Sequence, residues 1–306
     1  MSNFTEKDIP DLTGYTAIVT GGNSGIGYET TKQLALHNAR VYIASRNLDR
    51  VQKAIDELNQ QAGRKLDLHS LQMDLVDLKS VKAAAADFSA REERLDILIN
   101  NAGVMNVPFK LTKDGYETQW QANYVAPHVF TAALLPKLLA TAAAYDDKTR
   151  VRVVNVSSDL AFNGPKTINM ADPNMTKAKG MMELQQRYGH SKQAIIRDAV
   201  EINNRYASQG VTAFSVHPGI VKSGLQNSDP SLMGKIIRLA IRLSPTTHLQ
   251  AAYNSLWCAT TPAAAKQAGK FFMPVAKHDA RVEAWLKDSK GNAELYDATE
   301  EKTKAL

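Results

Sequence analysis

The sequence lacks features that define several classes of protein. Of its 306 residues, Cys258 is the only cysteine, which excludes an internal disulfide and any metal site built from several cysteines. We expect a reducing, cytoplasmic compartment. No stretch has the eighteen or so uncharged apolar residues of a membrane span, and the charged residues 1–14 lack the apolar run of a secretory signal. His190 and His217 have no metal-ligating partner at suitable spacing, so we expect no metal.

Concentrated positive charge is also absent. The chain has a net charge of +6, with 37 Lys and Arg against 31 Asp and Glu. These residues are scattered and form neither a basic run nor an alternation with aromatic residues. We therefore expect no nucleic-acid partner, and we interpret the charge as a mild preference for small anionic ligands.

What the sequence does contain is a regular alternation of two patterns. Short runs rich in Val, Ile or Phe alternate with longer segments whose apolar residues recur every three or four positions. The short runs are residues 15–21, 40–45, 67–75, 95–103, 151–158, 210–219 and 269–274. Residues 28–38 and 48–63 have the helical spacing, and Gly63 is a suitable helix C-cap. The alternation predicts an α/β fold with a doubly wound parallel sheet and helices on both faces.

Two stretches interrupt this alternation. Residues 159–187 are rich in Asn, Lys and Met, and residues 220–248 follow the sixth short run. Long irregular segments in compact domains are often functional. We interpret the first as an insert and the second as a candidate substrate lid.

The first chemical motif is "TGGNSGIG" at 20–27, between the first predicted strand and the first predicted helix. Gly21 permits a tight turn, Gly25 lets the backbone approach a phosphate, and Gly27 permits close helix packing. The N-terminus of the following helix then favours an anion. The motif in this position predicts a dinucleotide site.

The end of the second predicted strand indicates which dinucleotide is bound. A site for NAD usually has a carboxylate here, but this chain has "ASRN", with Ser45 and Arg46. Arg46 can bind a 2′-phosphate through charge-assisted hydrogen bonds, and Ser45 can donate its hydroxyl. The alternative is that Arg46 is an ordinary solvated arginine. We predict NADP(H) as the cofactor.

Several motifs in one order resemble the short-chain dehydrogenase/reductase family. They are "TGGNSGIG", "MDL" at 73–75, "NNAG" at 100–103, Asn123 in "QANYVAPHVF", Ser158 in "VNVSSD", "YGHSK" at 188–192 and "HPGIVKS" at 217–223. The resemblance implies one Rossmann-like domain over residues 1–306, with Asn123, Ser158, Tyr188 and Lys192 as catalytic residues. It implies cofactor contacts from Gly21, Asn23, Ser24, Gly25, Ile26, Gly27, Ser45, Arg46, Asp74, Leu75, Asn101, Ala102, Gly103, Tyr188, Lys192, Pro218, Gly219, Val221 and Ser223.

Within this family the chain looks most like the retinol-dehydrogenase-like branch and its fungal relatives. That resemblance rests on "NNAGVM", "TKDGYETQWQANY" and the C-terminal "LQAAYNSLWCATTP". Two departures stand out. Asp159 follows Ser158 where small or apolar residues are usual, and the gap from Ser158 to Tyr188 is long for the family.

The spacing of Tyr188 and Lys192 suggests acid/base chemistry. Positions i and i+4 share one face of a helix, so the Lys192 ammonium can lie near the phenol of Tyr188. We expect this cation to lower the pKa of Tyr188 toward a catalytically useful range. Ser158 would hydrogen-bond the reacting oxygen of the substrate. From the resemblance, Asn123 would hold a water linked to Lys192.

Residues 232–244, "LMGKIIRLAIRLS", have apolar residues at helical spacing with basic residues between them. As a lid helix they would cover the substrate, which would then be apolar or aromatic. The alternative is peripheral contact with an anionic membrane surface.

Together these features predict an NADP-preferring oxidoreductase that interconverts a carbonyl and an alcohol on a lipophilic or aromatic small molecule. One alternative is a tailoring reductase of secondary metabolism, and another is a non-catalytic NADP-binding regulator. The helices expected at 116–142 and 188–206 correspond to those that form dimers in the resembling family, so we predict a homodimer.

Overall fold

The computed structural model describes residues 3–178, 180, 182–221 and 246–304, and their strands form one eight-stranded sheet. The strands are β1 Thr16–Thr20, β2 Arg40–Ser45, β3 Leu68–Gln72, β4 Ile97–Asn100, β5 Val151–Val156, β6 Val211–Val216, β7 Phe271–Met273 and β8 Lys277–His278. Their order is β3-β2-β1-β4-β5-β6-β7-β8. All neighbours are parallel except β8, which pairs antiparallel with β7. The seven predicted strands are confirmed; β8 was not predicted.

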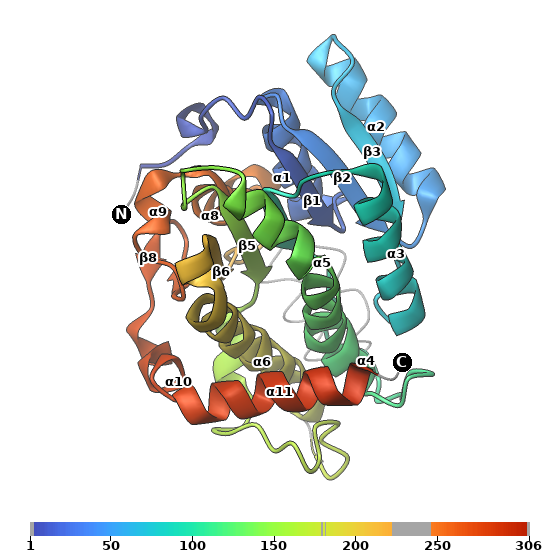
Figure 1. The fold of residues 1–306 in the computed structure, drawn as a ribbon. Coiled ribbons are helices and arrows are strands. Elements are labelled where there is room, and N and C mark those ends of the chain that lie inside the picture. Colours follow the sequence, from blue (N-terminus) through green and yellow to red (C-terminus); the bar gives the residue numbers. More distant parts are fainter. Residues whose placement is uncertain (1–2, 179, 181, 222–245, 305–306) are drawn as a thin grey trace.

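Helices cover both faces of this sheet (Figure 1). They are α1 Gly25–Leu36, α2 Leu48–Ala62, α3 Leu78–Arg91, α4 Thr118–Trp120, α5 Ala126–Ala143, α6 Glu183–Tyr206, α8 His248–Thr260, α9 Pro262–Ala265, α10 Glu283–Leu286 and α11 Ser289–Lys304. Helices α3, α5 and α6 pack on one face, and α1 and α8 pack on the other. The predicted α/β, doubly wound, Rossmann-like fold is therefore confirmed.

The central strands β1, β4, β5 and β6 are buried on both faces. Ile18 and Leu98 contribute to the core beneath α3, α5 and α6, whereas Ala17, Val19 and Ile97 contribute to the core beneath α1 and α8. Successive side chains of a strand point to opposite faces, so a sheet covered on both sides needs continuous apolar runs. This explains why these central strands are visible in the sequence as runs rich in Val and Ile.

The insert predicted at 159–187 is partly helical. It begins with the short 3₁₀ helix η3 (Asp159–Asn163), and its last residues form the first turn of α6, which begins at Glu183. Its described part is tied to the rest of the chain. The Asn174 side chain donates to Gly115 O (3.0 Å), and Lys302 Nζ donates to Met170 O (3.2 Å).

The C-terminal helix α11 crosses the outer side of α6 and the beginning of α5 (Figure 1). Tyr124 Oη lies 2.8 Å from Thr299 Oγ1, and Arg205 forms an ion pair with Asp297 at 2.8 Å. Buried Leu295 joins the core beneath this helix. Helix α11 therefore covers part of the surface through which we predict dimerisation.

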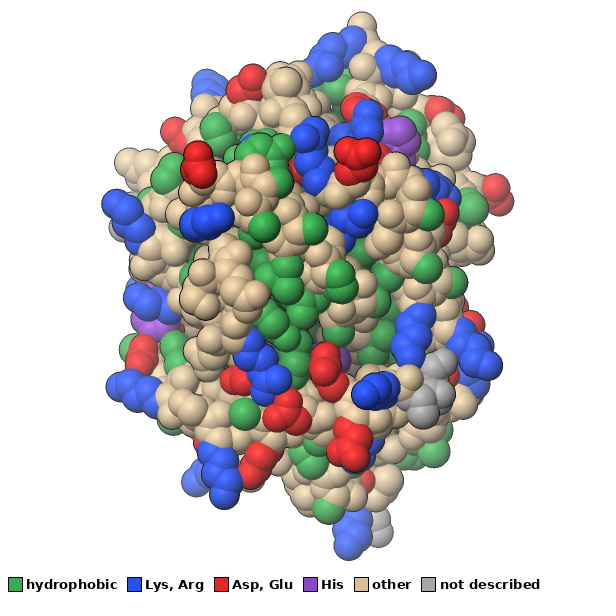
Figure 2. Space-filling view, in the orientation of Figure 1, with side chains coloured by type: hydrophobic (Ala, Val, Ile, Leu, Met, Phe, Trp, Pro, Cys, Tyr) green, Lys and Arg blue, Asp and Glu red, His purple; other side chains and the backbone are tan. Residues whose placement is uncertain are grey.

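The second half of α5 stays partly open to solvent. Its outward residues are mostly small and apolar, with one charge, and include Ala132, Ala133, Leu135, Pro136, Lys137, Leu139 and Ala140. Figure 2, drawn in the orientation of Figure 1, shows hydrophobic side chains gathered near the centre of the face of the molecule that is turned to the viewer. Residues Thr118–Ala143 are long and apolar enough to cross a membrane, but 61% of the most apolar window is buried inside the protein, which is typical of a core helix.

Ser223, the segment 232–244 and most of the predicted lid at 220–248 lie outside the described residues. What we predict for them therefore stays a prediction.

Candidate active site

The glycine motif forms the turn that joins β1 to α1. Gly21 and Gly25 have φ values of +67° and +56°, in the left-handed region that favours glycine. A Cβ on Gly27 would lie 2.4 Å from Gly21 O, whereas the space above Gly25 is open. These glycines therefore make a close-packed turn whose outer side has room for a ligand.

The N-terminus of α1 lies at this open space. Ser24 is the N-cap residue, but its side chain accepts no hydrogen bond from the first turn. The amides of the first turn, which includes Ile26, have no side-chain cap and are suited to a phosphate. Asn23 lies within the same turn. The residues present therefore fit a dinucleotide.

Residues after β4 brace this turn from the side. Asn101 Nδ2 donates to Thr20 O (2.9 Å), and the amides of Asn101 and Ala102 donate to Thr20 Oγ1 (2.9 Å each). The carboxyl ends of β1 and β4 are adjacent, which is where the strand order reverses. Asn101 thus positions the glycine turn, and contact with a cofactor stays a prediction.

Ser45 and Arg46 lie at the carboxyl end of β2, as predicted. Ser45 is half-buried, and its carbonyl accepts the amide of Met73 (3.0 Å). Arg46 is exposed and forms no hydrogen bond or ion pair with any described residue. Its guanidinium is therefore available for an anion beside the glycine turn.

Asp74 and Leu75 follow β3 and so lie, like Ser45 and Arg46, at the carboxyl ends of the strands. Asp74 Oδ1 accepts the amide of Val76 (3.1 Å), and the Asp74 amide donates to Ser80 Oγ (3.0 Å). Leu75 packs against the core and its carbonyl accepts Gln121 Nε2 (3.2 Å). Both residues shape a turn at the predicted adenine end of the site.

Asn123 lies in a π-helical turn, η2 (Gln121–Val125), between α4 and α5. Such turns are frequent at functional sites. Asn123 Oδ1 accepts the amide of Val104 (2.8 Å), while Nδ2 donates to Val104 O (2.9 Å) and Ser191 Oγ (3.0 Å). A Cβ on Gly103 would lie 2.7 Å from Asn123 Oδ1 and 3.5 Å from Lys192 Nζ. Asn123 therefore positions the loop after β4 beside Lys192.

Tyr188 and Lys192 lie one turn apart on α6, and both are buried. Lys192 Nζ donates to Val156 O (2.9 Å) and lies 5.7 Å from the centre of the Tyr188 ring. Ser158 follows β5 and caps η3, with Leu160 N donating to Ser158 Oγ (3.1 Å). The structure thus brings the three predicted residues together at the carboxyl end of β5.

Burial dominates the ionisation of these groups. It raises the pKa of Tyr188 above its ordinary value, although a hydrogen bond with Ser158 acts in the opposite direction. Burial also lowers the pKa of Lys192 to about 8. We predicted that Lys192 would lower the pKa of Tyr188; for the protein alone that prediction is wrong, because both groups lose the water that would stabilise their charged forms.

Ser157 has a structural role. Its amide donates to Val216 O (2.7 Å) and its hydroxyl donates to Lys192 O (2.7 Å). This interaction fixes α6 against β5 and thereby positions Lys192.

Pro218 and Gly219 follow β6, and Gly219 has a φ of +89°. Val221, the last described residue before the gap, is buried. Asn254 on α8 supports this turn, because its Nδ2 donates to His217 O (3.0 Å) and Phe272 O (2.8 Å). The sequence analysis did not identify Asn254, since an asparagine inside an apolar helix carries no sign of its distant partners.

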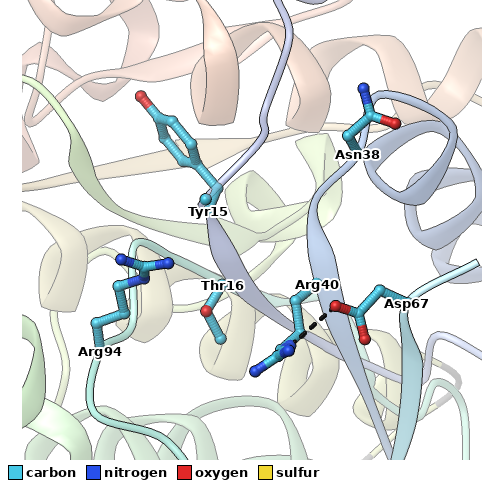
Figure 3. Close-up of a pocket in the computed structure, with 7 residues that line it drawn as sticks. Tyr15, Thr16, Asn38, Arg40, Asp67 and Arg94 are labelled. Atoms are coloured by element: carbon cyan, nitrogen blue, oxygen red, sulfur yellow. Dashed lines mark hydrogen bonds and ion pairs between the residues drawn. The ribbon is translucent and has the colours of Figure 1, made fainter.

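A pocket of about 180 Å³ lies at the amino ends of the strands, away from the glycine turn (Figure 3). Its lining includes Thr16 and Arg40 at the amino ends of β1 and β2. The Arg40 guanidinium is already paired with Asp67 at 2.9 Å. This pocket is therefore separate from the glycine turn and from Tyr188. Among the described residues no group of His, Cys, Asp and Glu is arranged to hold a metal ion.

A parallel sheet with a glycine turn after β1 and a buried Ser–Tyr–Lys group after β5 defines a nucleotide-dependent oxidoreductase fold. The sequence model of a family described as short chain dehydrogenase matches residues 15–170. The chain belongs to the short-chain dehydrogenase/reductase family, within its retinol-dehydrogenase-like branch and fungal relatives.

Individual relatives span most of the chain. It is 37% identical over 295 residues to an uncharacterized oxidoreductase of Schizosaccharomyces pombe, covering 93% of this chain and 85% of the relative. It is 36% identical over 261 residues to retinol dehydrogenase 12 of Homo sapiens, covering 85% and 78%. A crystal structure of an uncharacterized protein from Mycobacterium paratuberculosis superimposes with a TM-score of 0.72 at 26% identity, covering 99% and 98%.

Proposed function

We propose that this protein is an NADP-preferring oxidoreductase that interconverts an aldehyde or ketone and the corresponding alcohol on a lipophilic or aromatic small molecule. The observation that carries the proposal is the convergence of Ser158, Tyr188 and Lys192 at the carboxyl end of β5, next to the open glycine turn. Family membership supports oxidoreductase chemistry.

The cofactor would be held at three places. The amides at the N-terminus of α1 would bind its pyrophosphate, and Arg46 would pair with its 2′-phosphate. Lys192 would contact the ribose next to the nicotinamide. The nicotinamide supplies or accepts the hydride.

The chain's own residues handle the proton and the substrate oxygen. In reduction, Tyr188 Oη donates its proton to the carbonyl oxygen, and in oxidation it accepts the hydroxyl proton. Burial keeps the phenol protonated at neutral pH, which suits a proton donor. Ser158 Oγ hydrogen-bonds the same oxygen where negative charge develops.

The surroundings of the site favour an apolar substrate. Five large hydrophobic side chains are exposed among the described residues, namely Leu48, Phe109, Leu111, Met182 and Ile220. Leu48 follows Arg46 at the predicted cofactor site. Phe109 and Leu111 lie on the segment after β4, Met182 precedes α6, and Ile220 follows Gly219. Apolar side chains left in water are commonly covered when a ligand or partner binds.

We also propose a homodimer formed through the open half of α5. Its outward surface bears one charge, Lys137, among small apolar residues. Helix α11 covers only the other end of α5, near Tyr124.

A substrate panel tests the proposed function. Medium- and long-chain aldehydes, aromatic ketones and the matching alcohols would be assayed with NADPH, NADH and their oxidised forms. We expect reduction of at least one lipophilic carbonyl compound, faster with NADPH than with NADH. Tight NADPH binding with no turnover of any compound would instead indicate a cofactor-binding regulator.

A further inference from the structure

The hydroxyl of Ser158 is engaged on both sides. Its oxygen accepts the amide of Leu160 (3.1 Å), and its proton has two acceptors within reach, Asp159 Oδ1 (3.3 Å) and the phenol oxygen of Tyr188. A serine hydroxyl has a single proton to donate. In this arrangement the substrate oxygen must compete for that proton with the Asp159 carboxylate and with the phenol oxygen of Tyr188.

His217 contacts Asp159 through both ring nitrogens. The Asp159 amide donates to His217 Nδ1 (3.3 Å), so Nδ1 carries no proton and the neutral ring is protonated at Nε2. Nε2 lies 3.7 Å from Asp159 Oδ1. The side chain of His217 is 8% exposed and that of Asp159 is 38% exposed. The ring is thus buried against a carboxylate that still reaches solvent.

Protonation of His217 would change both contacts. Nδ1 would acquire a proton and could no longer accept the Asp159 amide, and the positive ring would attract the carboxylate at Nε2 more strongly. Both changes act on Asp159, which also holds the Ser158 hydroxyl. The sequence separates Asp159 and His217 by 58 residues, and the fold joins them because β5 and β6 are neighbours.

Other charged groups face this pair. Arg281 in η6 (Ala280–Val282) and Asp279 at its N-cap interact electrostatically with His217. Tyr188 on α6 interacts with the charge of Asp159. Arg281 Nε donates to Asp279 Oδ1 (3.0 Å) and its guanidinium lies 4.1 Å from the centre of the Phe162 ring. Asp279 therefore belongs to the same charged group, but its carboxylate accepts hydrogen bonds from Arg281 and none from Ser158.

We propose that Asp159 and His217 are a positioning pair for Ser158, which keeps the Ser158 O–H hydrogen-bonded to Asp159 while His217 is neutral and frees that O–H to donate to the substrate oxygen when His217 is protonated. The effect of the pair on the reaction rate rests on the proposed carbonyl chemistry. The contact between Asp159 and His217 does not depend on that chemistry.

Because His217 is buried, we expect it to be protonated only at acidic pH. Burial lowers the pKa of His217 from its ordinary value, while Asp159 acts to raise it. An ordinary histidine has a pKa of about 6.5. The Ser158 hydroxyl is therefore released from Asp159 at a pH below that value. Burial is the main cause of the raised pKa of Tyr188, and the Asp159 carboxylate adds to it in the same direction.

An NMR titration tests the pair without substrate. The imidazole signals of the whole chain would be followed from about pH 4 to about pH 8, with His217 assigned from the His217→Gln variant. We expect Asp159→Asn to lower the pKa of His217 by roughly one pH unit, because it removes an adjacent opposite charge. Asp279→Asn, the matched control, should lower it less. An unchanged His217 titration in Asp159→Asn, or an equal effect of both variants, overturns the pair.

A kinetic titration tests the control of Ser158. In the unmodified protein, kcat/KM for carbonyl reduction should rise as the pH falls through the measured pKa of His217. Asp159→Asn and His217→Gln should both lose this inflection while NADPH binds with an unchanged Kd, and Asp279→Asn should retain it. An inflection that persists in Asp159→Asn contradicts the proposal. If no carbonyl compound is reduced, the proposed function fails, and the NMR titration alone decides whether the pair exists.

Discussion

Replacing Arg46 by alanine should remove most of the preference for NADPH over NADH. The side chain is exposed at the carboxyl end of β2 and has no ion-pair partner among the described residues, so no compensating interaction inside the protein is lost. A hydrogen bond to a charged group contributes about 1.5–3 kcal/mol. Because Arg46 is exposed, we expect the lower end of this range, which corresponds to about a tenfold increase in the Kd of NADPH.

The assay is a fluorescence titration of each cofactor, which needs no substrate. The Kd of NADH should change by less than about twofold, since NADH has no 2′-phosphate. Arg50→Ala is the matched control: Arg50 is also exposed, in the first turn of α2, and its amide donates to the N-cap Asn47. Equal Kd values of the two cofactors in the unmodified protein, or equal losses in Arg46→Ala and Arg50→Ala, would refute the assignment of Arg46.

Three further changes have expected outcomes. Ser158→Ala should lower kcat by roughly 10²-fold or more with little effect on the Kd of NADPH, because one donor to the reacting oxygen is lost; a kcat within about threefold of the unmodified protein argues against that role. Burial lowers the pKa of Lys192 from 10.5 to about 8, so over that pH range the unfolded chain binds a proton that the folded chain has released. The free energy of unfolding should therefore rise with pH there, and denaturant titrations of Lys192→Met should lack that part of the rise. Light scattering should give twice the chain mass for the unmodified protein and the single-chain mass for Ala140→Glu on the outward face of α5, whereas a monomer at all micromolar concentrations refutes the dimer.

The fold could be predicted from the sequence where local patterns determine it. Strands buried on both faces need runs of β-branched residues, and these runs are visible at β1, β4 and β5. Gly63 was predicted as a helix C-cap and has a φ of +62°. Strand β8 has only two residues and follows a turn, so no periodic pattern could reveal it. The π-helical turn at Gln121–Val125 was also invisible, because its apolar spacing differs little from that of an α-helix.

For the site, motifs indicated which residues meet but not how they interact. The sequence spacing places Lys192 near Tyr188, but it does not show how deeply both are buried, and burial decides the direction of both pKa shifts. The contact between Asp159 and His217 depends on the pairing of β5 with β6, which no local pattern encodes. In the sequence, Asp159 stands out only as an unusual neighbour of Ser158.

The central claim is that Tyr188 is the proton donor, and Tyr188→Phe tests it most directly. The ring of phenylalanine fills the same buried volume, so α6 and the contact of Lys192 with Val156 O should persist. On a confirmed carbonyl substrate, kcat should fall by about 10³-fold or more, while the Kd of NADPH from fluorescence titration should stay within about twofold. Ordinary turnover by Tyr188→Phe would contradict the account.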